Sequence, residues 1–217
     1  MMVMPANGGH NKVHYWAGRY GFLGHLYSPG AQRGPFPHLP YALDNGAFGA
    51  FKNDTAWDSE AWLDLLKWAK ANDQKPLWAA VPDVVGNAQE TLENWYRWSP
   101  VVRSYGFKAA LCAQDGMTDE QIRGCDADVL FVGGGTEWKW ANLYRLCDLH
   151  DWVHVGRVNG YRGLAKCYDA GAKSCDGTGW FRGDKNQLAG LERYLEEVAE
   201  GKVPSLAGQT GQGAMWS

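Results

Sequence analysis

The sequence predicts an α/β fold, a compact (β/α)8 TIM-like barrel that forms a single domain. Short apolar runs of strand length alternate along the chain with segments of helical periodicity, which is typical of parallel strands covered by helices. Seven such runs in one chain favour a closed barrel over an open sheet. The 217 residues are enough for one sizeable core, although barrels of this kind typically have about 250.

The candidate strands are apolar on both faces, as buried parallel strands should be. They are Tyr20–Tyr27, Tyr41–Leu43, Leu77–Val81, Lys108–Ala113, Val129–Val132, Val153–Val155 and Ala172–Cys175. An eighth strand is not obvious. Either residues 10–20 supply it or the barrel is irregular.

Capping residues and apolar stripes mark the helices between these strands. The candidate N-caps are Asp58, Asn87 with Glu90, Thr118 with Gln121, and Asp184. Apolar side chains follow each cap at helical spacing, as in Trp62, Leu65, Leu66 and Ala69. Gly171 and Gly201 can end two of the helices.

Residues 1–203 form the predicted barrel domain, and residues 204–217 form a tail. The tail has no periodicity and is rich in Gly and Gln, so we expect it to be mobile. No internal repeat and no linker divides the chain.

Composition limits the classes of function. The formal net charge of −3 is not the basic balance of a protein that holds nucleic acid by charge alone, so any nucleic-acid site has to be a local basic patch. The 12 Trp and 10 Tyr residues can fill a core or stack on planar ligands, and core is the default. Five cysteines without a C-x-x-C pair indicate reduced thiols, and six histidines in no ligand pattern predict no metal site.

Targeting signals are not expected either. The N-terminus lacks a charged region followed by an apolar one, and no run of 18 apolar residues exists. The sequence therefore predicts a cytoplasmic protein with no membrane span.

Polar residues or glycines follow six consecutive candidate strands. They are Asp44, Asp83, Gln114, Gly133 to Gly135, Gly156 with Arg157, and Asp176. Taken one at a time, each is explained by a turn, a loop or a helix cap. In a barrel, however, the carboxyl ends of the strands converge on one site, so three carboxylates and a glutamine there predict an active site.

The chemistry of this set is specific. A carboxylate can accept the two N–H donors of a guanine edge, and glutamine offers both a donor and an acceptor. Glycines let the backbone approach a flat ligand. A further carboxylate can attack an anomeric carbon, and burial beside other carboxylates raises the pKa of at least one of them.

Five motifs in order resemble the tRNA-guanine transglycosylase superfamily. "LDNGAF" (43–48) is similar to its L-D-S-G-G-F element, "VPDVVG" to the aspartate after the next strand, and "CAQDG" to V-Q-G-G. "VGGGTEW" is similar to G-G-L-x-V-G-E, and "AKSCDGTGWFR" to the nucleophile element D-x-F-D-C-V-x-P-T-R. The resemblance covers roughly residues 40–182.

The resemblance implies a role for each matching residue. Asp176 would be the nucleophile and Asp44 the general acid/base, while Asp83 and Gln114 would read the guanine edge. Backbone contact to the base would come from Gly134 or Gly135, a supporting carboxylate from Glu137, and a phosphate contact from Arg182. Apart from the resemblance, Phe48 or Trp138 could stack on a base. The stretch 156–163, with Arg157, Asn159 and Arg162, could form a phosphate-binding edge that Arg182 and Lys185 extend. For the stretch 156–163 a solvated loop is the alternative.

The chain differs from the tRNA enzymes in ways that change the expected substrate. Nothing after Cys175 could supply their zinc site, and the chain is far shorter. It looks most like the compact phage DpdA-type enzymes, which exchange guanine in DNA for a 7-deazaguanine such as preQ0. The implied activity is that of a pentosyltransferase that needs no cofactor, with DNA and a deazaguanine as partners, and a helper protein that opens the duplex.

Three rival functions remain open. An N-glycosidase that hydrolyses the same bond, or a tRNA-type enzyme, would have a similar site. A non-catalytic module that kept only the base pocket is the alternative from another class.

Overall fold

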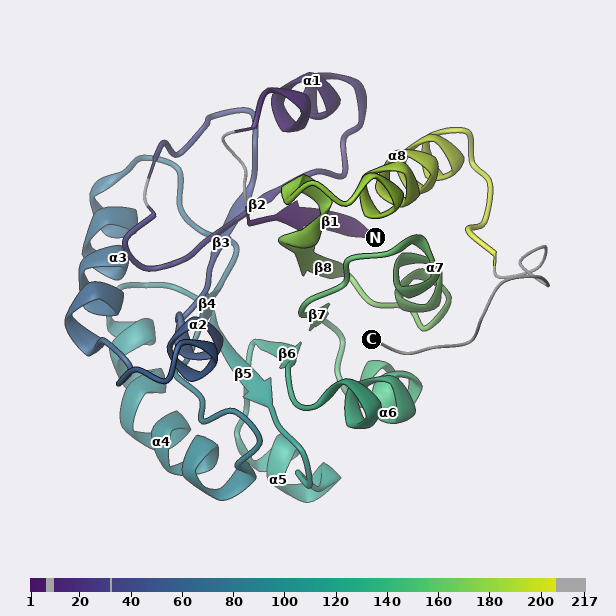
Figure 1. Ribbon diagram of the computed structural model, residues 1–217. Helices are drawn as coiled ribbons and strands as arrows, with labels where there is room; N and C mark the ends of the chain where they lie inside the picture. Colours follow the sequence, from purple (N-terminus) through teal and green to yellow (C-terminus); the bar gives the residue numbers. More distant parts are fainter. Residues whose placement is uncertain (7–9, 32, 206–217) are drawn as a thin grey trace.

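The computed structural model describes residues 1–6, 10–31 and 33–205 as a ring of parallel strands surrounded by helices (Figure 1). The strands are β1 (Met2–Pro5), β2 (His25–Tyr27), β3 (Tyr41–Leu43), β4 (Ala79–Ala80), β5 (Ala109–Ala113), β6 (Val129–Val132), β7 (Val153–Val155) and β8 (Ser174–Gly177). They form one eight-stranded sheet in the order β1-β8-β7-β6-β5-β4-β3-β2. A parallel bridge between Val3 and Leu23 joins its two ends. The predicted (β/α)8 barrel is confirmed.

The first strand lies where the sequence did not indicate it. The prediction that residues 10–20 supply the eighth strand is wrong, because Asn11–Arg19 form helix α1 and Met2–Pro5 form β1 beside β8. Helix α1 buries Val13 and Trp16, which lie three residues apart on one face. The barrel is irregular elsewhere: between β2 and β3 the described residues of the segment 28–40 contain no helix.

The other helices follow their strands and cover the outside of the ring, except for α2, which borders the cavity described below (Figure 1). They are α2 (Ala47–Lys52), α3 (Ser59–Ala71), α4 (Ala88–Ser104), α5 (Asp119–Gly124), α6 (Thr136–Leu149), α7 (Tyr161–Asp169) and α8 (Lys185–Ala199), with a 3₁₀ turn η1 at Gly179–Phe181. The predicted caps Asp58, Asn87, Thr118 and Asp184 each accept a hydrogen bond from a backbone N–H of the following turn. Thr118 and Gln121 form the complete reciprocal capping box.

The alternation of side chains along each strand separates two apolar cores. The larger core lies between the sheet and the helices. The smaller one fills the barrel and contains Met4, Leu26, Ala42, Trp78, Ala80, Ala110, Cys112 and Val129. Two residues further along several strands, the next inward positions carry polar side chains, among them Ser28, Asp44 and Gln114. The strand geometry therefore places apolar side chains at the bottom of the barrel and polar side chains at its open end, where the strands end.

Two further expectations concern the C-terminal tail and the absence of a membrane span. The predicted mobility of the tail concerns residues that, from 206 onwards, lie outside the described part of the chain. Within the described part, no helix combines the length and the apolarity needed to cross a membrane.

Candidate active site

A cavity of ≈ 1180 Å³ opens at the carboxyl ends of the strands. It is lined by ten of the residues predicted from the sequence: Asp44, Phe48, Asp83, Gln114, Gly134, Arg157, Asn159, Arg162, Asp176 and Arg182. The volume suits a nucleoside or a larger ligand, since pockets for small molecules span about 300–1,000 Å³. The structure therefore brings most of the predicted set to one place.

Three predicted residues lie outside this cavity. Gly135 is the N-cap of α6, and its N–H donates to Asp115 Oδ2 at 2.5 Å. Glu137 and Lys185 are exposed residues in the first turns of α6 and α8. A backbone contact to a ligand in the cavity would thus come from Gly134, whose left-handed φ of 63° and tight approach to Asp115 and Trp138 leave no room for a Cβ.

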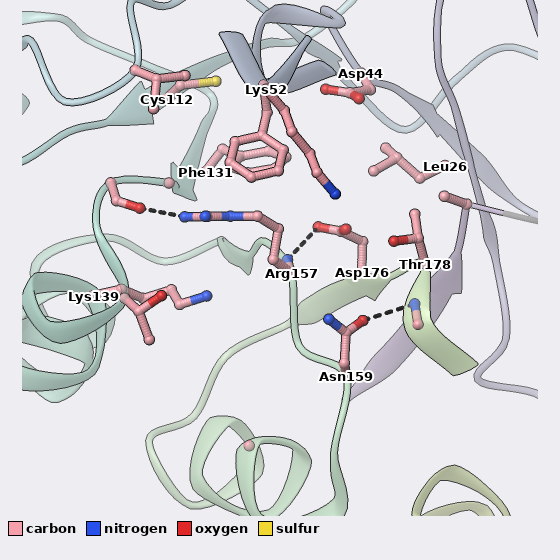
Figure 2. A pocket seen from close by; sticks show the side chains of 18 of the residues that line it. Leu26, Asp44, Lys52, Cys112, Phe131, Lys139, Arg157, Asn159, Asp176 and Thr178 are labelled. Atoms are coloured by element: carbon pink, nitrogen blue, oxygen red, sulfur yellow. Dashed lines mark hydrogen bonds between the residues drawn. The ribbon is translucent and has the colours of Figure 1, made fainter. Parts of the chain in front are cut away.

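Asp176 lies within β8 and not after it, and it faces the barrel interior with 6% of its surface exposed. Its Oδ1 accepts a hydrogen bond from the backbone N–H of Arg157 at 3.3 Å (Figure 2). His154 Nε2 lies 3.1 Å from the same oxygen. Within the described part of the chain, no hydrogen bond reaches Oδ2, so this oxygen remains for a ligand.

Asp44 directly follows β3 and faces Asp176 across the cavity (Figure 2). Its oxygens accept bonds from Asn45 N at 2.8 Å and from Ser28 Oγ at 3.1 Å. Burial raises the pKa of Asp44, and the charge of Asp176 raises it further. Asp44 is therefore the carboxyl group of this pair that is suited to carry a proton.

Asp83 and Gln114 form a polar wall together with Asn45. Asn45 Nδ2 donates to Asp83 Oδ1 at 2.8 Å, and Gln114 Nε2 donates to Asp83 Oδ2 at 2.6 Å. Gln114 Oε1 in turn accepts from Gly86 N at 2.9 Å. Burial raises the pKa of Asp83 to about 6, while the bond from Asn45 opposes the shift. A ligand that binds Asp83 has to replace or share these bonds.

Cationic side chains also line the cavity. The guanidinium of Arg157 donates to Gly134 O and lies 4.4 Å from the ring centre of Phe48. Burial lowers the pKa of Arg157. Arg162 and Arg182 also line the cavity, and Asn159 holds η1 through a 3.0 Å bond from Gly179 N. Arg157 thus lies within the cavity and not only at its edge.

The sequence reasoning missed four residues of this region. Asn45, Lys52 and Lys139 line the cavity, and His154 lies beneath Asp176. Figure 2 shows Lys52 extending from α2 into the cavity. Lys139 is only 2% exposed, its Nζ donates to Gly156 O at 2.7 Å, and burial lowers its pKa to about 8.

The sequence does contain signals for two of these residues. Lys139 lies on the helical stripe of Leu143 and Leu146, so a charged residue stands at a predicted core position. His154 stands between two buried valines in a three-residue strand, which places it on the opposite, inward face. Among the residues that the structure describes, no group of three or more His, Cys, Asp or Glu side chains is placed to hold a metal ion.

Comparison with known proteins supports the fold alone. No family model and no curated protein matches the sequence. A chain of the Amycolatopsis orientalis BexX/CysO complex superposes with a TM-score of 0.55 at 14% identity, covering 95% of this chain and 94% of that chain. A protein from Aquifex aeolicus VF5 superposes with a TM-score of 0.52 at 14% identity, covering 93% and 91%. A TIM-barrel fold is common among enzymes, whose sites lie at the carboxyl ends of the strands.

Proposed function

We propose that this protein is a base-exchange transglycosylase that replaces guanine in DNA with a 7-deazaguanine such as preQ0. The observation that carries the proposal is the pairing of two carboxyl groups, the buried Asp176 and the half-buried Asp44, across one cavity. One has an oxygen left for attack, and the other has a raised pKa. Glycosyl transfer through a covalent intermediate needs this combination of nucleophile and proton donor.

The reaction has two balanced halves. Asp176 Oδ2 forms a bond to C1′ of a deoxyguanosine, the C1′–N9 bond breaks, and its electron pair goes to N9, which takes the proton of Asp44. The deazaguanine then occupies the vacated site. Asp44, now ionised, removes the N9 proton of this base, N9 attacks C1′, and the ester bond returns its electrons to Asp176.

Asp83, Gln114 and Gly134 supply the recognition of the base. The Asp83 carboxylate accepts the N1–H and 2-amino donors that guanine and a 7-deazaguanine share, and Gln114 adds a donor and an acceptor. Both bases have to fit the same wall, because the exchange binds them in turn. Position 7 is where they differ, so the wall that carries Asp83 does not have to distinguish them.

The cations of the cavity favour a nucleic acid over a free nucleoside. Arg157, Arg162 and Arg182 line the cavity of a chain whose formal net charge is −3, so the positive charge is local. Such residues position a phosphate backbone without reading its sequence. Asp176 lies inside the barrel, so a base in a duplex has to leave its stack, which costs a few kcal/mol. A helper protein that opens the duplex is part of the proposal.

The test is incubation of the protein with guanine-containing DNA and isotope-labelled preQ0, followed by mass spectrometry of the nucleosides. We expect labelled deazaguanosine in DNA and an equal amount of free guanine. Asp176→Asn should abolish both, whereas Asp64→Asn, which changes an exposed carboxylate on α3, should not. Guanine release without incorporation would indicate a glycosidase, incorporation only into tRNA would change the substrate, and binding without either product would indicate a binding module.

A further inference from the structure

A chain of hydrogen bonds runs through the inside of the barrel and ends on Asp176. Trp152 Nε1 lies 3.5 Å from Ser174 Oγ, which lies 2.8 Å from His154 Nδ1. His154 Nε2 then lies 3.1 Å from Asp176 Oδ1. These hydrogen bonds connect neighbouring strands, because His154 on β7 and Ser174 on β8 are partners in the sheet register.

When the imidazole is neutral, only one order of donors and acceptors lets every group in this series make its hydrogen bonds. The indole N–H can only donate, so Ser174 Oγ accepts from it and turns its own hydrogen towards His154 Nδ1. Nδ1 is then an acceptor, and the single ring proton is on Nε2. The carboxylate of Asp176 can only accept, so it receives this proton in a hydrogen bond. The two ends of the chain thus fix the histidine tautomer.

Packing holds the histidine in place. His154 is 0% exposed, and its ring centre lies 4.7 Å from the rings of both Trp78 and Phe131. Ser174 is 1% exposed. A ring enclosed in this way cannot rotate to another partner without disturbing the barrel core, so its Nε2 keeps pointing at Asp176.

We propose that His154 is a positioning residue that makes Oδ2 of Asp176 the attacking oxygen. Oδ1 is held by His154 Nε2 and by the backbone N–H of Arg157, so the carboxylate cannot turn. In the ester, Oδ1 becomes the carbonyl oxygen and still accepts both bonds. When the ester breaks, the same donors stabilise the returning carboxylate charge. This inference rests on the proposed function, because it assigns Asp176 the role of nucleophile.

The test combines a spectroscopic and a kinetic measurement on the full-length chain. In ¹⁵N NMR of the ring nitrogens, His154 of the wild type should have its proton on Nε2, and Ser174→Ala should keep it there, because the Asp176 carboxylate still accepts from Nε2–H. His154→Phe, which keeps an aromatic ring among Trp78 and Phe131, should lower kcat about 10- to 100-fold with KM nearly unchanged, the usual effect of losing a hydrogen bond to a charged group. His154→Gln restores an N–H donor and should recover part of kcat.

Each outcome supports or overturns the proposal. A proton on Nδ1 in the wild type, or full kcat in a folded His154→Phe protein, would overturn it. If His154→Phe does not fold, the wild-type tautomer decides, because a neutral ring with its proton on Nδ1 has no donor for Asp176 Oδ1 and overturns the proposal. His38→Phe, a histidine that does not line the cavity, is the matched control. If the wild type exchanges no base at all, the proposed function fails and the positioning role fails with it. The NMR result separately decides the direction in which the hydrogen bonds between Trp152, His154 and Asp176 are donated.

Discussion

At the scale of single residues, three aspartates of the same cavity differ because their partners differ. Asp176 is held by an imidazole and a backbone N–H, and Asp44 by a serine and its own neighbour's N–H. Asp83 has both oxygens occupied by side-chain amides. Only Asp176 combines a fixed oxygen with an oxygen left for a ligand. Identical side chains can therefore serve as nucleophile, proton carrier and base reader.

The first prediction separates the roles of Asp44 and Asp176. Asp44→Asn should slow base exchange about 10²- to 10⁴-fold, the usual contribution of a general acid/base. Asp176→Asn should abolish the covalent protein–DNA complex altogether. The complex is measured on denaturing gels after incubation with DNA alone, and exchange is measured by mass spectrometry.

The same variants define the expected effect of pH. In the proposed mechanism, guanine release requires the proton of Asp44, whose raised pKa keeps it protonated to higher pH than an ordinary aspartate. The rate of release should therefore fall as pH rises, and Asp44→Asn should remove this dependence. A covalent complex that still forms with Asp176→Asn would assign the nucleophile to another residue.

Single residues also show which parts of the candidate site could be predicted from the sequence alone. Asp44, Asp83, Gln114 and Asp176 could be predicted because each stands at or beside a strand end, and strand ends in a barrel share one location. His154 and Lys139 could be found only by noticing a polar residue at an inward or buried position. Their partners lie on other parts of the fold: Asp176 is on β8, and Gly156 directly follows β7. Spacing along the chain therefore cannot reveal them.

At the scale of elements, the short helix α2 links the cavity to the surface. It begins three residues after Asp44, and its Phe48 and Lys52 line the cavity. Phe51, three residues after Phe48 and thus on the same side of the helix, is 62% exposed. Under the proposed function the cavity takes one base, and an exposed aromatic ring beside it is suited to fill the gap that the base leaves in its stack.

The second prediction concerns this ring. Phe51→Ala should reduce base exchange in duplex DNA about tenfold or more, because the open stack loses a contact of more than about 1.4 kcal/mol. Exchange in single-stranded DNA should change little. Tyr96→Ala on α4, a ring that is 64% exposed away from the cavity, is the control. The fluorescence of 2-aminopurine next to the target guanine measures opening of the stack, and an equal loss on both DNA forms would contradict a role in opening.

At the scale of the whole molecule, the barrel was predictable and its closure was not. Alternating strands and helices fixed the fold class, because parallel strands buried on both faces have a simple apolar signature. The four residues of β1 lie at the extreme N-terminus and have no repeated pattern, so only their pairing with β8 identifies them as a strand. Strand ends shifted for the same reason: β8 extends to Gly177 because it pairs with β1, which places Asp176 inside the strand.

The third prediction follows from the distribution of charge over the molecule. The chain has a formal net charge of −3, so its affinity for DNA should depend on the few cations at the cavity and fall steeply with salt. Arg182→Ala should reduce the slope of log K against log salt by about 1. Arg97→Ala, on the exposed side of α4, should leave the slope unchanged. Fluorescence anisotropy with labelled DNA at several salt concentrations measures both slopes, and equal slopes for the two variants would remove Arg182 from the interface.

The fourth prediction concerns the stability of the whole fold. The pKa of Asp83 is raised from 3.8 to about 6 in the folded protein, so between these values the folded state holds a proton that the unfolded chain has lost. The free energy of unfolding therefore falls as pH rises through this window, by up to about 3 kcal/mol from Asp83 alone. Asp83→Asn removes this term, so the variant should gain stability relative to the wild type between pH 4 and pH 7, whatever its stability at pH 4. Urea unfolding of both proteins at these two pH values measures the gain. Asp64→Asn, an exposed change, should show no gain. The absence of a gain in Asp83→Asn would mean that Asp83 has the same pKa in the folded and unfolded states, so that the cavity stabilises its charge as well as water does.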